Sequence, residues 1–152
     1  MDMANEYQTG VVPSLTTLID RAGLIRRWQH GSDAFFWRQE RAGRLLPVLH
    51  GGLLRYRWRD VFEFEGGLPP ADRAAEYFSD LMRPAQVATV LNCAPDFILK
   101  AARKGVLPAR RVGRSWRFVP GEVGRWQQQS WASRPGQMNG ISRKIASSPS
   151  GE

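Results

Sequence analysis

The feature that most constrains this chain is an order of predicted elements that occurs twice. Each copy has the pattern of a helix, a turn, a second helix, a β-hairpin and a final helix. Aligned positions in the two copies stay 61 to 63 residues apart throughout. A repeated supersecondary unit of this length predicts two small modules built on one plan. Chance similarity between two short amphipathic segments is the alternative.

The second copy has the clearer signals. Pro84 can occupy a first helical position, and an apolar stripe follows it. A second helix begins at Asp96, with an acid in its first turn and cations in its last turn, and Gly105 ends it. Residues 107–112 and 116–119 are predicted to be the strands of a hairpin, after which the last helix begins.

The first copy follows the same order with weaker signals. Residues 20–28 align with 83–91, and residues 34–43 align with 96–105. The later positions match as ordered pairs: Leu46-Pro47 with Leu107-Pro108, Arg55-Tyr56 with Arg117-Phe118, and Asp60-Val61 with Glu122-Val123. The pattern predicts a mostly α fold with small β-hairpins, in the α+β class.

Turn-rich sequence sets the predicted domain boundaries. Residues 65–70 combine paired glycines with paired prolines, which helices and central strands do not accept. The sequence after 133 lacks apolar periodicity. We expect a first domain at 14–66, a linker at 67–78, a second domain at 79–131 and a disordered tail at 132–152.

The excess positive charge lies in the second half of the chain. Residues 1–79 contain ten Lys and Arg against ten Asp and Glu, whereas residues 80–152 contain twelve against four. The whole net charge of +8 therefore belongs to the second half. A neutral half joined to a strongly basic half indicates contact with a polyanion at one end. A basic, solvated surface without such a partner is the alternative.

The composition argues against several classes of protein. Hydrophobic residues make up 42% and charged residues 24%, which is a globular balance, and no apolar run has the length of a membrane span. A single cysteine, Cys93, excludes an internal disulfide framework and is expected to lie buried in the turn between two helices. His30 and His50 are too few for a metal site. We expect a cytoplasmic protein with no metal and no cofactor.

Enzyme chemistry has little support in this sequence. It contains no glycine-rich phosphate loop, no paired-carboxylate motif and no Ser or Cys with a plausible nearby base. We therefore expect a protein that is not an enzyme.

Several separate features of the second copy occur in a fixed order. They are Arg103-Lys-Gly105, Leu107-Pro108, Arg110-Arg-Val-Gly-Arg114, Trp116-Arg-Phe118 and Trp126. In this order they resemble the excisionase-type (MerR-like) winged helix-turn-helix family. The resemblance covers about a third of the chain directly, and about two thirds with the first copy. It implies two tandem winged helix-turn-helix domains, of which the first is divergent.

The resemblance implies DNA binding, with the second helix in the major groove and the hairpin wing on phosphates or in a minor groove. The charges point the same way, because Lys100 and Arg103 lie three apart and can project from one helix face. A solvated basic hairpin is the alternative. The candidate DNA-binding residues are Lys100, Arg103, Lys104, Arg110, Arg111, Arg114, Ser115 and Arg117 in the second copy, and Arg38, Arg41 and Arg55 in the first.

Some positions depart from the family pattern. Asp96 either accepts from a cytosine amino group or stabilises the helix N-terminus, which is the favoured interpretation. Phe97 is expected in the core rather than on a thymine methyl group. Leu53 and Leu54, at the tip of the first hairpin, indicate a protein contact. The aromatic group expected to be mostly core is Phe35, Phe36, Trp37, Tyr56, Trp58, Phe62 and Phe64.

These observations predict a protein that binds double-stranded DNA and is associated with the nucleoid. Proteins similar to this pattern act as excisionases or recombination directionality factors of mobile elements, and an integrase or self-association along DNA would then be further partners. A transcriptional regulator with the same fold is the first alternative. A protein-interaction adaptor, whose basic half binds an acidic protein surface, is the alternative from another class.

Overall fold

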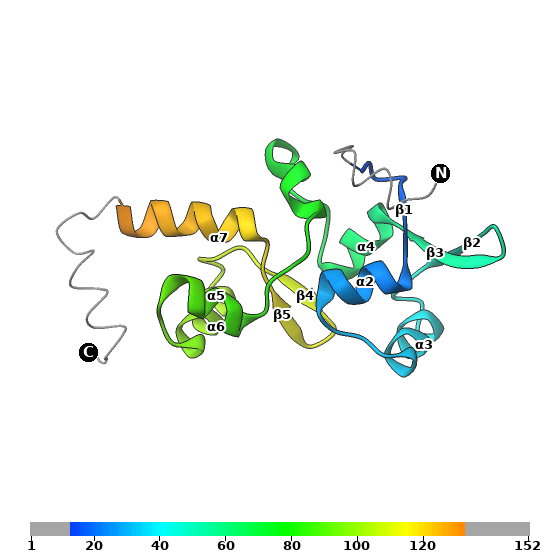
Figure 1. The fold of residues 1–152 in the computed structure, drawn as a ribbon, viewed down its shortest axis with the longest axis horizontal. Coiled ribbons are helices and arrows are strands. Elements are labelled where there is room, and N and C mark those ends of the chain that lie inside the picture. The colour runs from blue at the N-terminus through cyan, green and yellow to red at the C-terminus, as the bar shows by residue number, and fades with distance from the viewer. Residues whose placement is uncertain (1–12, 133–152) are drawn as a thin grey trace. The chain divides into compact units, whose positions relative to one another are not determined.

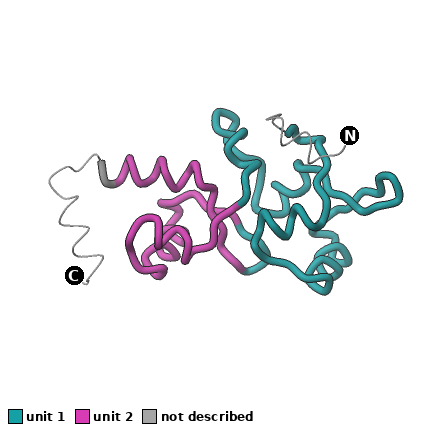
Figure 2. Tube along the Cα trace, in the orientation of Figure 1, with its two compact units in different colours: residues 1–80, 111–114 teal, residues 81–110, 115–152 magenta. Residues whose placement is uncertain are grey.

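The computed structural model describes residues 13–132 of the chain. It divides into two compact units (Figure 2): unit 1 contains residues 1–80 and 111–114, and unit 2 contains residues 81–110 and 115–152. The expected disordered tail lies outside the described residues except for its first position, Ala132. Within residues 13–132, no helix is both long and apolar enough to span a membrane.

Unit 1 consists of short helices and a three-stranded antiparallel sheet (Figure 1). In chain order its elements are β1 (Leu18–Asp20), α2 (Arg21–Trp28), α3 (Asp33–Arg41), β2 (Pro47–His50), β3 (Leu53–Arg57), α4 (Trp58–Glu65) and the 3₁₀ helix η1 (Ala71–Phe78). The strand order is β1-β3-β2, with β3 in the centre. The helix, turn, helix, hairpin and helix expected from the first copy are therefore all present.

Local sequence determines where the helices of unit 1 begin. The Asp20 side chain accepts a hydrogen bond from the Gly23 backbone N–H at 2.8 Å, which caps α2. The Ser32 side chain accepts one from the Phe35 backbone N–H at 3.1 Å, which caps α3. These caps satisfy backbone donors that the first turn of a helix leaves without partners.

An aromatic cluster fills the core of unit 1. The Trp28 ring stacks on Phe36 and Phe64, with centroids 5.9 and 5.2 Å away. Most of the aromatic residues expected in the core are buried, but Trp37 is exposed. Trp37 is the exception because Phe35 and Phe36 take the inward face of α3, and the helical period turns Trp37 outward.

A buried ion pair joins helices α2 and α4 of unit 1. Arg27 Nε and Nη2 donate to the two carboxylate oxygens of Glu65 at 2.8 and 2.9 Å, and both side chains are almost fully buried. Trp28 Nε1 donates to the same carboxylate at 2.6 Å. Arg27 Nη1 donates to the carbonyls of Tyr77 and Ser79, both at 2.5 Å. One guanidinium therefore connects α2 with the end of α4, the end of η1 and Ser79 after it.

The stretch expected as a linker, 67–78, contains η1 and belongs to unit 1. Tyr77 is buried, and the Phe78 ring lies 5.0 and 5.1 Å from the rings of Trp58 and Phe62. Paired Gly and Pro residues at 66–70 end α4 and redirect the chain, and the segment after them packs on the aromatic core.

Unit 2 has the element order expected from the second copy. The elements from residue 81 onward are α5 (Pro84–Leu91), α6 (Pro95–Arg103), β4 (Arg110–Val112), β5 (Ser115–Arg117), α7 (Pro120–Gln127) and the π-helix η2 (Gln128–Ala132). Residues 111–114, which include most of β4 and the hairpin turn, are grouped with unit 1. Both strands are shorter than predicted. Pro108 has no N–H for a ladder, and the Phe118 backbone pairs with Met82 instead, with N···O distances of 2.9 and 2.8 Å.

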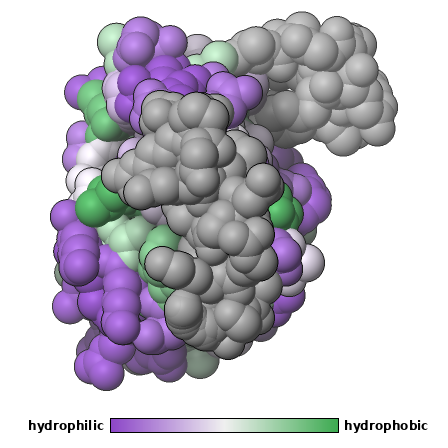
Figure 3. Space-filling view, turned by 90° about the vertical axis from the view of Figure 1, so that its left-hand side faces the viewer, coloured by the Kyte–Doolittle hydropathy of each residue, from purple (hydrophilic) through white to green (hydrophobic). Residues whose placement is uncertain are grey.

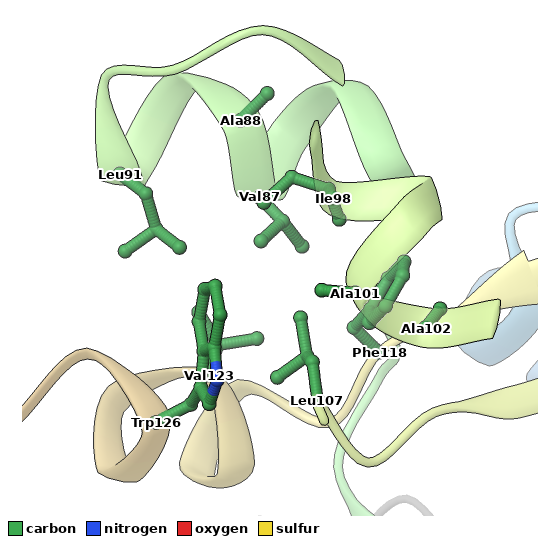
Figure 4. Packing of buried hydrophobic residues seen from close by; sticks show 10 residues of the cluster. All are labelled: Val87, Ala88, Leu91, Ile98, Ala101, Ala102, Leu107, Phe118, Val123 and Trp126. Atoms are coloured by element: carbon green, nitrogen blue, oxygen red, sulfur yellow. The ribbon is translucent and has the colours of Figure 1, made fainter. Parts of the chain in front are cut away.

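The core of unit 2 packs α5 and α6 against α7 and the strand end (Figure 4). Its buried residues are Val87, Ala88, Leu91, Ile98, Ala101, Ala102, Leu107, Phe118, Val123 and Trp126. Cys93, in the turn between α5 and α6, packs against this cluster and is half-buried rather than buried. Burial raises the pKa of its thiol. The small side chains of Ala101 and Ala102 let α6 approach the other elements of the core closely.

The ion pair of unit 1 gives a stability prediction. Glu65→Gln keeps the side-chain shape but leaves Arg27 as a buried charge without its counterion, so we expect the free energy of unfolding to fall by about 3–5 kcal/mol. Chemical denaturation of the full chain measures this. The matched control is Asp80→Asn, which removes an exposed pair with Arg26 at 3.8 Å and should change stability by less than about 1 kcal/mol. Equal effects of the two substitutions would contradict the role given to Glu65.

Candidate nucleic-acid interface

The second helix of unit 2, α6, has one buried face and one cationic face. Ile98, Ala101 and Ala102 lie in the core. On the other side Lys100, Arg103 and Lys104 are exposed, Lys104 being the residue that caps the helix. Among the described residues, Arg103 and Lys104 form no ion pair, so both can bind an anion without losing an existing partner.

The turn between α5 and α6 sets the position of this face. Asn92 ends α5 in the left-handed conformation, with φ 56° and ψ 53°, and Asn adopts this conformation more readily than most residues. Pro95 then begins α6 at a position where its missing N–H costs nothing. The two helices therefore join through a tight turn whose geometry the local sequence specifies.

Asp96 lies at the start of α6 on the same exposed side as Lys100. Its carboxylate is 3.4 Å from Lys100 Nζ in an i,i+4 ion pair, and both side chains are well exposed. The pair partly neutralises Lys100, and the carboxylate also interacts favourably with the positive end of the helix dipole. Asp96 therefore lowers the attraction of α6 for a polyanion.

The cations of the β4–β5 hairpin differ widely in accessibility. Arg110 and Arg117 are each only 7% exposed, whereas Arg114 is exposed, and Arg111 and Ser115 are half-buried. Arg117 Nη1 donates to the Trp116 carbonyl at 2.8 Å. Burial and the nearby charge of Arg83 lower the pKa of Arg117. Alternation along a strand places only some of these residues at the surface.

The comparison with protein-family models assigns this segment. Residues 81–130 match the model described as a helix-turn-helix domain, which covers about a third of the chain and most of unit 2. This segment is a helix-turn-helix DNA-binding domain. Comparison with curated proteins and with solved structures gives no significant match. The match supports the DNA-binding part of the sequence prediction.

The part of the surface that Figure 3 shows in colour is mainly hydrophilic, with separate hydrophobic areas between the hydrophilic residues. Two of the exposed apolar residues of the domain are Val90 on α5 and Phe97 on α6. A hydrophilic surface with isolated apolar residues suits contact with a hydrated polyanion.

Phe97 differs from its expectation. It was predicted for the core, but 38% of its surface is exposed, and its ring lies 6.1 Å from that of Trp126. Its position directly before the buried Ile98 places it at the edge of the apolar face of α6. Phe97 lies in the first turn of α6, next to the exposed Asp96.

In unit 1 the predicted DNA-binding residues have different environments. Arg38 and Arg41 are exposed on α3, and Arg55 on β3 is half-buried. Glu40 stands where the second copy has Ala102. Its carboxylate accepts hydrogen bonds from the Tyr56 hydroxyl and from Arg21 Nη2. Burial and this bond to Glu40 raise the pKa of Tyr56 to about 12. Glu40 therefore has a structural role in unit 1.

Sequence reasoning missed one surface feature of α3. The exposed Trp37 ring has the Arg41 guanidinium 5.0 Å from its centroid. The residues are four apart and so share a face, which is the signal that could have identified them. Among the described residues, no group of three or more His, Cys, Asp or Glu could hold a metal ion.

The ion pair on α6 gives a prediction about affinity. Asp96→Asn should raise affinity for duplex DNA by about threefold to tenfold at low salt, because it removes a negative charge and releases Lys100. The gain should shrink as salt rises. Fluorescence anisotropy with a labelled duplex measures it. A loss of affinity confined to one sequence would instead show that Asp96 accepts from a base.

The hairpin cations give a second prediction, which separates binding from folding. Arg114→Ala should lower the slope of log affinity against log salt by about 0.9 and leave stability almost unchanged, since Arg114 is exposed. Arg117→Ala should lower the free energy of unfolding by about 1–3 kcal/mol, because it leaves a cavity. Salt titration and thermal denaturation of each variant test both. An unchanged slope for the first variant would remove Arg114 from the interface.

Proposed function

We propose that this protein is a non-enzymatic, nucleoid-associated DNA-binding protein with two tandem winged helix-turn-helix modules, acting as an excisionase-like recombination directionality factor of a mobile element. The observation that carries the proposal is the cationic face of α6 within a helix-turn-helix domain. In this domain α6 is the helix that would enter the major groove.

The charge distribution supports this use of α6. The exposed cations Lys100, Arg103 and Lys104 lie within five residues, close enough to contact neighbouring phosphates and base edges. Arg114, on the hairpin that follows, is a further exposed cation and is grouped with unit 1. Each phosphate contact adds about 0.9 to the magnitude of the slope of log affinity against log salt, so the slope counts how many of these cations contact phosphates.

The architecture of unit 1 supports a second module of the same kind. Its order of α2, α3, the β2–β3 hairpin and α4 repeats that of α5, α6, the β4–β5 hairpin and α7. Exposed Arg38 and Arg41 on α3 correspond in the alignment to Lys100 and Arg103 on α6. Two modules on one chain would raise affinity for closely spaced sites through effective concentration.

Recombination directionality factors place DNA and an integrase in a defined geometry, so an integrase or further copies of this chain along the DNA are the proposed partners. A transcriptional regulator is the second candidate, because a helix-turn-helix domain serves both roles through the same surface. The two functions differ in where the protein binds, and not in how α6 contacts the groove.

A map of the bound sites across the genome tests the proposal. We expect the intact protein to concentrate at repeats that flank an integrated element, and binding at promoters alone would favour the regulator. The variant Lys100→Ala/Arg103→Ala should lose these sites, with affinity for the specific site reduced by about 1–3 kcal/mol for each base contact removed. If purified protein binds no duplex even at low salt, the adaptor alternative replaces DNA binding.

A further inference from the structure

The β2–β3 hairpin of unit 1 extends beyond the sheet that supports it. β1 pairs with β3 only at residues 55–57, so the hairpin beyond them is two-stranded. We call residues 49–54 the hairpin arm. In Figure 1 the β2–β3 hairpin projects away from α3 and α4 of its own unit. A two-stranded ribbon of this kind has no apolar layer of its own to cover its side chains.

The arm carries three exposed leucines. Leu49 is 74% exposed, Leu53 58% and Leu54 46%. Leu49 and Leu54 are direct partners across the strands, so their side chains lie on one face. That is also the face of Tyr56, two positions along β3, which is buried in the core. The apolar face of the sheet therefore continues outward past the core as the pair Leu49–Leu54.

The tip of the arm is thin. Gly51 and Gly52 both have positive φ, +59° and +79°, which is the pattern of a two-residue type I′ turn. Neither residue carries a side chain, so the turn adds no bulk beyond the backbone. A narrow tip flanked by leucines has the shape of a wedge.

The positive charge near the arm indicates which kind of partner the arm binds. Residues 41–59 contain five arginines: Arg41, Arg44, Arg55, Arg57 and Arg59. The nearest acids in the sequence are Glu40 and Asp60, and Asp60 pairs with Arg57 at 3.4 Å. Within the described residues Arg55 has no ion-pair partner, and its buried Nε has no hydrogen-bond partner. Arg55 and Arg57 lie on the opposite face of β3 from Leu54, so they flank the leucine pair rather than cover it. A second copy of this chain packed around the arm would bring like charges together, whereas duplex DNA is strongly negative.

We propose that the arm inserts the Leu49–Leu54 pair between stacked base pairs of duplex DNA and kinks the duplex. Apolar wedges on a basic scaffold are a general way to bend DNA, and the surrounding arginines would hold the phosphates on either side. The inference rests on the proposed function, because DNA bound by the helix-turn-helix domain is what brings duplex close to the arm. The bend gives the excisionase-like role a physical basis.

The test uses the full chain and duplexes that carry 2-aminopurine, a base analogue whose fluorescence rises on unstacking, at successive positions. We expect wild-type protein to raise fluorescence at one base step and to bend an end-labelled duplex by about 20–90° in energy-transfer measurements. Leu49→Ser/Leu54→Ser should abolish both signals while duplex affinity stays within about tenfold. The matched control, Leu68→Ser, removes an exposed leucine of the same unit outside the hairpin and should keep both signals.

The outcomes separate the two proposals. Wild-type binding without any fluorescence change, or signals that persist in the double variant, would overturn the wedge and leave DNA binding intact. A dimer in sedimentation that the double variant dissociates, with no unstacking, would show that the leucines bind a second copy. Absence of duplex binding by the wild type would overturn the proposed function and the wedge with it. Circular dichroism of each variant checks that the fold is retained.

Discussion

The buried ion pair between Arg27 and Glu65 is the interaction on which unit 1 depends. Two charges at the centre of an aromatic core are stable only because each hydrogen-bonding atom has a partner. The same guanidinium lies 4.9 Å from the Trp58 ring centroid, so the aromatic side chains also contact the cation. Its hydrogen bonds to the carbonyls of Tyr77 and Ser79 attach the segment after α4 to the core of unit 1.

This arrangement explains what the sequence could and could not indicate about the fold. Capping residues, prolines at first helical positions and glycine turns are local signals, and they place the helices of both units well. The role of Arg27 is not local, because its partner lies 38 residues away. A charged residue next to Trp28 gives no signal of burial until the fold brings Glu65 to it.

The candidate site shows the same difference between what local sequence signals and what depends on the fold. Sequence spacing identified Lys100 and Arg103 as neighbours on one helix face, because helical periodicity alone determines which residues share a face. It could not separate Arg114 from Arg117, because the accessibility of a strand residue depends on what covers the sheet. Spacing favoured a core position for Phe97, and this is wrong because the burial of an edge position on an amphipathic helix depends on the neighbours that cover it.

The two units differ in the side chains that form their cores and in those that they expose. Unit 2 has a cationic helix face over a core of mainly aliphatic residues with Phe118 and Trp126, and unit 1 has a large aromatic core with an exposed leucine-bearing arm. The first copy has Glu40 where the second has a small residue. This fits the difference between the units, because the Glu40 carboxylate accepts hydrogen bonds from Tyr56 and Arg21.

The separation of the two faces of α6 has a consequence for how such a protein can change over time. Its inward positions, Ile98, Ala101 and Ala102, carry the packing, while Asp96, Lys100 and Arg103 have no part in the core. Exchanges at the outward positions therefore leave folding almost untouched. Under the proposed function, in which α6 contacts the groove, a lineage could acquire new target sequences through a few codon changes while the packing residues stay the same.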